Sequence, residues 1–286
     1  MPMKDPQTTT SGSIIDTAPT RTTTSAIQPL EEGFRILHVM HSASAQHEFK
    51  VGFHSSGTIE PVRFEDGSLV LHAPDGTYLG DIEPPWAIDA NGSPVPTRYR
   101  WEHGTLIQVV DHDPRHHRYP IVIDPKWTYG YNLTAIGAAG YPTLGVNTAM
   151  AMRELRRCFN CSFPIKGAPR SYPKTGQNIN LNAWPLPGGT VVPAPIRVPG
   201  TTSTGFSFVA RQGHFDGAGS TISFRFYHTC LANAPMLRLS VKATITKHRP
   251  FLERQVIRAT TYTTWSRFVS ATADNAGIKQ GYHGKC

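Results

Sequence analysis

Residues 220–247, STISFRFYHTCLANAPMLRLSVKATITK, decide the fold of the second half of the chain. Apolar residues at 222, 224 and 226 alternate with polar ones, which is the two-residue period of a half-buried β-strand. Positions 237 to 244 alternate in the same way. Two neighbouring strands of this kind would place Arg225, Arg238 and Lys242 on one outward face of an antiparallel sheet.

Helical patterns flank this sheet. In residues 147–159, Asn147 can cap a first turn, and apolar residues at 151, 155 and 159 share one face. Residues 250–271 predict a second helix, and further strands are expected within 179–184, 190–198 and 205–213. The order of helix, curved antiparallel sheet and closing helix is similar to helix-grip lipid-binding folds, in layout rather than in motif. We therefore expect a mainly β protein with flanking helices (α+β).

The two halves of the chain differ in charge. Residues 1–126 contain 10 Lys/Arg and 16 Asp/Glu, a formal charge of −6, whereas residues 127–286 contain 18 and 4, a charge of +14. Such asymmetry indicates an anionic partner for the basic half: nucleic acid, a lipid headgroup surface or the acidic half itself. A basic surface kept for solubility is the alternative interpretation. We expect an acidic β-rich module over 33–126, a hinge over 127–146 and a basic α+β domain over 147–286.

All four cysteines, Cys158, Cys161, Cys230 and Cys286, lie in the basic half. Four cysteines allow three pairings, and the sequence does not choose among them. A single C-x-x-C without a nearby pair of histidines supports no zinc site, so two disulfides are favoured, and no metal or other cofactor is expected. Disulfides imply an oxidising compartment, hence a secreted protein, although no signal peptide is visible.

The acidic half begins with a Thr/Ser/Pro-rich segment, residues 1–32, for which the composition predicts disorder. From Gly33 onward, short β-branched or aromatic runs are separated by Asp66-Gly67, Asp75-Gly76 and Asn91-Gly92. These dipeptides tolerate positive φ and suit tight turns, so an antiparallel module is expected.

Residues 33–127 also resemble a module of secreted actinobacterial proteins. The likeness is carried by Asp66-Gly67, Pro85-Trp86-Ala87, Asp89 to Gly92, Pro96-Thr97, Tyr99, Gln108 to Asp111, Tyr119-Pro120 and Asp124-Pro125. In those proteins the module precedes variable C-terminal domains, several of them toxin-like. The resemblance implies export and a shared leader or pro-module, and it assigns no chemistry to the second half.

Carboxylates are scarce in the basic half, which makes a glycosidase or a two-metal nuclease a poor fit. Metal-independent RNA cleavage needs fewer groups, and its candidates are His214 and His228, with Asp216 to orient a histidine. The alternative interpretation makes residues 213–219 a tight turn and His228 the end of a strand.

Non-enzymatic binding competes with this enzyme hypothesis. Its candidate residues, which combine cations with aromatic rings as phosphate-binding surfaces do, are Arg211, Arg225, Arg238, Lys242, Trp184 and Tyr227. We therefore expect a secreted, toxin-like effector whose basic domain engages a membrane surface or nucleic acid and is carried by the acidic module. A ribonuclease toxin and a structural cell-envelope protein are the alternatives.

Overall fold

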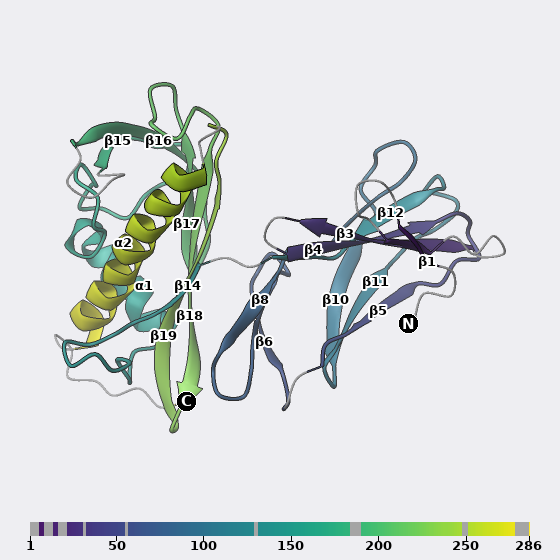
Figure 1. Cartoon of the computed structure of the whole chain (residues 1–286), viewed down its shortest axis with the longest axis horizontal. Coiled ribbons are helices and arrows are strands. Elements are labelled where there is room, and N and C mark those ends of the chain that lie inside the picture. The colour runs from purple at the N-terminus through teal and green to yellow at the C-terminus, as the bar shows by residue number, and fades with distance from the viewer. Residues whose placement is uncertain are drawn as a thin grey trace. The chain divides into compact units, whose positions relative to one another are not determined.

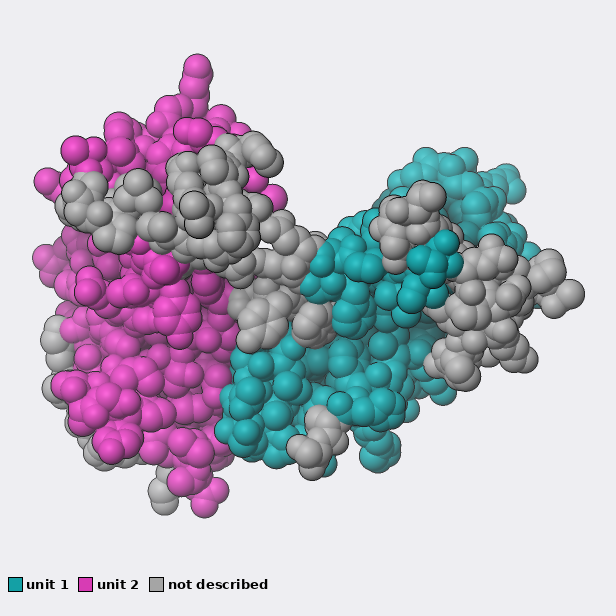
Figure 2. All heavy atoms as spheres, in the orientation of Figure 1, with its two compact units in different colours: residues 1–130 teal, residues 131–286 magenta. Residues whose placement is uncertain are grey.

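The computed structural model describes residues 6–8, 14–16, 22–30, 33–54, 57–128, 131–183, 190–247, 251–277 and Cys286. The chain divides into two compact units, residues 1–130 (unit 1) and residues 131–286 (unit 2), which Figure 2 shows in different colours. Because residues 127–130 are uncharged, the units keep the formal charges of −6 and +14. The division falls four residues after the predicted boundary at 126.

Unit 1 is built from antiparallel strands in two sheets (Figure 1). The larger sheet runs β1-β2-β3-β4-β13-β8-β7-β6, with β12 joining β4 to β9, and the smaller sheet runs β10-β11-β5. The bounds are β1 Pro6–Thr8, β2 Ile14–Asp16, β3 Thr23–Leu30, β4 Gly33–Met40, β5 Glu48–Gly52, β6 Glu60–Arg63, β7 Leu69–His72, β8 Tyr78–Ile82, β9 Trp86–Ile88, β10 Thr97–Glu102, β11 Thr105–Val110, β12 Ile121–Asp124 and β13 Lys126–Thr128.

The core of unit 1 consists of two small apolar clusters, and each contains residues of both sheets. One joins Met40 and Ile123 of the larger sheet to Val110 of β11. The other joins Leu69 and Leu71 of β7 to Leu106 of β11 and neighbouring residues. The two sheets therefore pack face to face through their inward side chains, as in a β-sandwich.

The predicted turns of unit 1 are confirmed. At Asp66-Gly67, between β6 and β7, the Asp66 carboxylate accepts the backbone N–H of Ser68 at 3.0 Å, and Gly67 has a φ of 81°. At Asp75-Gly76, between β7 and β8, Asp75 accepts from Thr77 at 2.8 Å, and Gly76 also has a φ of 81°. Both turns use the local carboxylate bond and the positive φ that make Asp-Gly a turn dipeptide.

The expectation of disorder over residues 1–32 is wrong for residues 23–30, which form β3. Strand β3 pairs with β4 along its whole length, from Thr23 opposite Met40 to Leu30 opposite Gly33. The Ser25 hydroxyl also lies 2.8 Å from Nδ1 of His38 on β4. The Thr and Ile side chains of β3 favour a strand when a partner strand is present. A prediction from composition considers a segment alone and therefore does not include its pairing with another strand.

Unit 2 is an α+β unit whose sheet runs β14-β19-β18-β17-β16-β15. Its elements are β14 Tyr131–Thr134, α1 Thr148–Arg157, the 3₁₀ turn η1 Phe159–Cys161, β15 Asn178–Ala183, β16 Val192–Thr201, β17 Gly205–Ala210, β18 Thr221–Leu231, β19 Ala234–Thr244 and α2 Phe251–Gly277. Figure 1 shows α2 lying across one face of this antiparallel sheet, which is the predicted helix-grip layout.

Aromatic rings fill the space between α2 and the sheet. The ring centroid of Phe163 lies 4.7 to 6.1 Å from those of Phe159, Phe206, Phe208, Phe224, Trp265 and Phe268. The Thr-rich middle of α2 is tolerated because hydroxyls such as those of Thr261 and Thr264 donate to the carbonyl four residues earlier.

In the predicted hinge over 127–146, residues 127–128 and 131–134 belong to strands, and residues 129 and 130 lie outside the described residues. Strand β13 pairs with β4 and β8 in unit 1, and β14 pairs with β19 in unit 2. Residues 135–145 are also held in place, as shown by the bond from Gly145 N–H to the Pro235 carbonyl at 2.8 Å. The described residues of 127–146 therefore belong to strands of the two units and to a loop held by backbone hydrogen bonds.

The predicted start of α1 and the two disulfides are present in the structure. The Asn147 side chain accepts the backbone N–H of Met150 at 3.0 Å, as an N-cap does. Cys158 is bonded to Cys161, and Cys230 is bonded to Cys286. The second bond fixes the C-terminal residue to strand β18. Two disulfides indicate an oxidising environment.

Candidate functional site

The strands of unit 2 divide their side chains between a core face and an opposite face. In β18 and β19, Phe224 is paired with Val241 and Phe226 with Leu239, and all four are buried in the core. The residues between them point the other way. Arg225, Arg238 and Lys242 therefore share the face opposite the core, as predicted, but Arg225 and Lys242 are half-buried there and Arg238 is buried.

We call this surface the cationic face and define it by Arg197, Arg225, Arg238 and Lys242. Arg225 lies opposite Ser240, Arg238 opposite Tyr227, and Lys242 opposite Ser223. Arg225 is thus a diagonal neighbour of both Arg238 and Lys242, at Cβ separations of about 7–8 Å. The described strands of the sheet contain no Asp or Glu, so like charges are gathered here without acidic neighbours in the same strands.

Sequence reasoning missed Arg197, which lies on β16. The buried residues Ala194, Ile196 and Val198 alternate there with outward positions, and Arg197 is exposed. The same alternation is visible in the sequence and could have identified it. The predicted Arg211 lies at the start of the turn after β17, where its backbone N–H donates to Pro195 at 2.9 Å. Neither guanidinium has a bonding partner among the described residues.

The two aromatic candidates for stacking do not form a platform in the described structure. The Tyr227 hydroxyl donates to Oδ1 of Asn132 on β14 at 2.6 Å, which ties the phenol across the sheet. Beside it, Nε of Arg238 donates to the Thr229 hydroxyl at 3.0 Å. Trp184 lies outside the described residues. The face is therefore characterised by its cations and hydroxyls.

The predicted catalytic group His214, Asp216 and His228 is not assembled. His214 and Asp216 lie in the turn before β18, whereas His228 lies seven residues along that strand from Thr221. Seven residues of strand correspond to about 23 Å. His228 instead approaches α1, where its Nδ1 is 2.8 Å from the Thr148 hydroxyl.

The turn that holds His214 has a structural explanation. Its Nδ1 accepts the backbone N–H of Asp216 at 3.1 Å, and its ring stacks on Phe215. Gly213 and Gly217 have φ values of 89° and 90°, which favour glycine. Burial lowers the pKa of His214 to about 4, so the ring is neutral at neutral pH. These contacts match the alternative interpretation of residues 213–219 as a tight turn.

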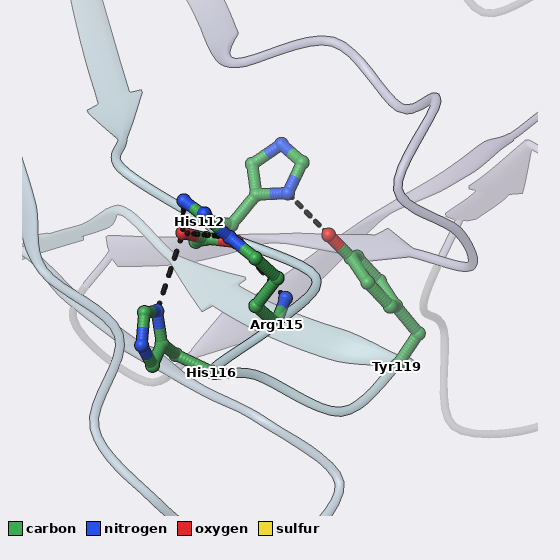
Figure 3. Close-up of polar contacts among 5 residues, drawn as sticks. His112, Arg115, His116 and Tyr119 are labelled. Carbon is green, nitrogen blue, oxygen red and sulfur yellow. Dashed lines mark hydrogen bonds and ion pairs between the residues drawn. The ribbon is translucent and has the colours of Figure 1, made fainter.

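Unit 1 contains a second polar cluster, in the loop between β11 and β12 (Figure 3). The Asp113 carboxylate accepts from the guanidinium of Arg115 at 2.8 Å and lies 3.2 Å from Nδ1 of His116. The side-chain bond from Arg115 holds the pKa of Asp113 well below its usual range. Nearby, the ring of His112 contacts the Tyr119 hydroxyl and stacks on His47. The cluster ties the loop together with charges that neutralise one another.

The described ranges contain neither a metal site nor a membrane-spanning helix. No group of three His, Cys, Asp or Glu side chains there is placed to hold a metal ion. Neither of the two described α-helices is both long and apolar enough to cross a bilayer.

Comparison with known proteins identifies no family. No family model matches the chain, and no curated protein matches it. Among solved structures it is similar to the di-domain ARO/CYC protein StfQ from the steffimycin biosynthetic pathway, with 8% identity, a TM-score of 0.38, and coverage of 97% of this chain and 88% of that one. Bacillus halodurans protein BH1534 (12% identity, TM-score 0.33) and Ara h 8.0201 (10% identity, TM-score 0.33) are each matched over 51% of this chain and over 94% and 95% of their own. At these TM-scores the likenesses assign no activity to this chain.

Proposed function

We propose that this chain is an exported, two-part bacterial protein whose unit 2 engages a phosphate-bearing anionic target, as a toxin-like effector carried by unit 1. The observation that carries the proposal is the cationic face, whose strands contain no carboxylate. Lipid headgroups and nucleic acids both present phosphates to such a surface. Export is supported by the two disulfides and by the resemblance of residues 33–127 to a secreted module.

Charge placement within unit 2 supports this proposal. Glu154 is buried and paired with Arg157, whose guanidinium lies 2.6 Å from Oε1. Asp216 lies in a turn and Asp274 on α2, so neither is on a strand of the sheet. Exposed Arg197 and Arg211 therefore raise the potential of the face, and we expect them to steer an anionic target toward it.

The test measures binding of the full-length chain to phosphatidylcholine vesicles with and without phosphatidylserine, and to single-stranded RNA. Binding is expected to weaken as salt rises from about 50 to about 200 mM. Arg197→Glu together with Arg211→Glu should reduce binding to every anionic target. Lys166→Glu together with Arg170→Glu is the matched control, because both lie on the connection between η1 and β15 and both are exposed.

The possible outcomes separate the hypotheses. Equal loss in both double variants would mean that net charge acts without a defined face. Absence of binding to vesicles and RNA at low salt would overturn the proposal and leave the structural alternative. RNA cleavage is tested on the same samples. We expect none, because His214 lies in the turn before β18 and His228 lies near the far end of that strand.

A charge-based role for unit 1 is tested separately. Each unit has its own core and its own sheets, so residues 131–286 are expected to fold when expressed alone. With net charges of −6 and +14, residues 1–130 added as a second chain should compete with the anionic target at low salt. Unchanged binding in their presence would exclude shielding by the acidic unit.

A further inference from the structure

Residues 135–145 form an exposed loop of unusual composition, which we call the apolar loop. They follow β14 and lie inside a run of 26 residues, 127–152, that contains no charged side chain. Three large apolar side chains of the loop are exposed: Tyr141 at 76%, Leu144 at 40% and Ile136 at 39%. Exposed apolar groups that cluster in this way mark a surface that meets another apolar phase.

The backbone of the loop is held by hydrogen bonds that satisfy several of its N–H groups. Ile136 and Pro142 form a β-bridge, and Gly137 N–H donates to the Tyr141 carbonyl at 2.9 Å. Gly140 N–H and Thr143 N–H also donate to backbone carbonyls, at 2.9 and 2.8 Å. Because these N–H groups are already bonded, moving the loop out of water costs less than for an open segment.

The apolar loop is continuous with one end of the cationic face. Thr134, the last residue of β14, lies opposite Arg238, and Leu144 forms a β-bridge with Met236, two residues earlier in β19. Leu231, which is 44% exposed, lies at the β18–β19 hairpin of the same end. The exposed apolar side chains of the loop and of the hairpin therefore lie at the same end of the sheet, next to the strand that contains the buried Arg238.

An exposed cation flanks the loop on its other side. The backbone N–H of Ile136 donates to the Ser270 hydroxyl of α2 at 2.9 Å. Arg267 precedes Ser270 by one helical turn, is exposed, and makes no hydrogen bond or ion pair with any residue that the structure describes. Asp274, one turn after Ser270 on the same helix, is half-buried and is the carboxylate nearest to Arg267 in sequence.

We propose that the apolar loop inserts into the interfacial layer of an anionic lipid bilayer, with Arg267 beside the headgroups. The inference rests on the proposed function for its electrostatic part and selects a membrane over nucleic acid. An apolar tip with an exposed cation beside it complements a lipid surface, where acyl chains meet anionic phosphates. Tyrosine suits this position because its ring is apolar and its hydroxyl is polar. Nucleic acid would need the cations but not the apolar tip.

The experiment uses the full-length chain and vesicles of phosphatidylcholine with about 30% phosphatidylserine, a content chosen to give a strongly negative surface. Tyr141→Asp together with Leu144→Asp is expected to lower vesicle partitioning by about tenfold or more, because it removes buried apolar area and adds repelled charge. Ile245→Asp is a matched control, since Ile245 is 46% exposed but follows the opposite end of β19. Tyr141→Trp should retain partitioning and show a blue-shifted emission with vesicles.

Each outcome has a distinct meaning. If the loop variant loses vesicle binding but keeps RNA binding, the insertion is supported, provided its circular dichroism and unfolding midpoint match those of the parent chain. Vesicle binding that is equal in the loop variant, the control and the parent would overturn insertion while leaving the cationic face intact. Binding to RNA without binding to vesicles would overturn the membrane inference alone. Binding to neither would overturn the proposed function as well.

Discussion

The two units treat charge in opposite ways. In unit 1, cations pair with carboxylates, as in Arg35 with Asp124 and Arg100 with Glu48, or carboxylates such as Asp89 accept backbone N–H groups. In unit 2, the described ion pair is Arg157 with Glu154, and Arg197, Arg211 and Arg267 are exposed without described partners. Unit 1 uses these charges to hold its own loops and strands, whereas Arg197, Arg211 and Arg267 of unit 2 present charge to their surroundings.

Asp89 illustrates the first of these uses. The Asp89 carboxylate accepts the backbone N–H groups of Asn91 and Ser93 at 2.9 Å and that of Arg118 at 3.0 Å. These backbone bonds, Arg118 first, hold the pKa of Asp89 below its usual value. Buried Gln108 donates to Thr97 at 3.1 Å. Asp89, Gln108 and Thr97 therefore have structural roles in this chain.

The largest expected difference between the units comes from covalent cross-links, which unit 1 lacks because it contains no cysteine. The bond between Cys230 and Cys286 spans 56 residues, and Cys230→Ser with Cys286→Ser should cost unit 2 about 4 kcal/mol of unfolding free energy. The bond between Cys158 and Cys161 spans 3 residues, and its removal should cost about 2 kcal/mol. Hydrogen exchange measured residue by residue, with and without reductant, separates the units. If reductant lowered the exchange protection of unit 1 as much as that of unit 2, the difference in cross-linking between the units would not explain their stabilities.

A second difference is expected on acidification. Burial lowers the pKa of His38, in the larger sheet of unit 1, from 6.5 to about 4. The folded state then binds fewer protons than the unfolded state, so the contribution is complete above about pH 6.5 and declines as the pH falls toward about 4. A shift of this size corresponds to at most about 3 kcal/mol.

His38→Gln should flatten the dependence of the unit 1 unfolding midpoint on pH between about 6.5 and about 4. His214→Gln is the comparison in unit 2, where burial also lowers the pKa to about 4, but in a turn less buried than His38. We expect a smaller change there because such a turn lets water reach a protonated ring. A larger pH dependence from His214 than from His38 would contradict this ordering.

Local signals in the sequence predicted much of the fold. The alternation in β18 and β19 predicted which side Arg225, Arg238 and Lys242 share, and Asn147 marked the start of α1. Asp66-Gly67 and Asp75-Gly76 marked turns, because their determinants lie within a few residues. In each case the physical cause is contained in the segment itself.

Features that depend on distant residues were not predictable from local patterns. Strand β3 forms because β4 lies beside it, and the pairing of Cys230 with Cys286 depends on where the chain end returns. The separation of His214 from His228 depends on how far β18 runs without a break. The sequence also did not show that, within the uncharged run from 127 to 152, residues 135–145 form a hydrogen-bonded loop with exposed apolar side chains.

The smallest expected effects test the central comparison most directly. The side chain of Asp124 is fully buried beside Arg35, at 2.9 Å, so Asp124→Ala should destabilise unit 1 by about 2 kcal/mol. Asp111→Ala, which breaks an exposed pair with Arg98, should cost less than about 1 kcal/mol.

In unit 2, Arg197→Ala should change the unfolding free energy by less than about 0.5 kcal/mol, because the guanidinium has no described partner to lose. Urea unfolding of the three variants measures these values. If Arg197→Ala proved as destabilising as Asp124→Ala, its cation would be part of the structure of unit 2, and the cationic face would lose its interpretation as a surface kept for a target.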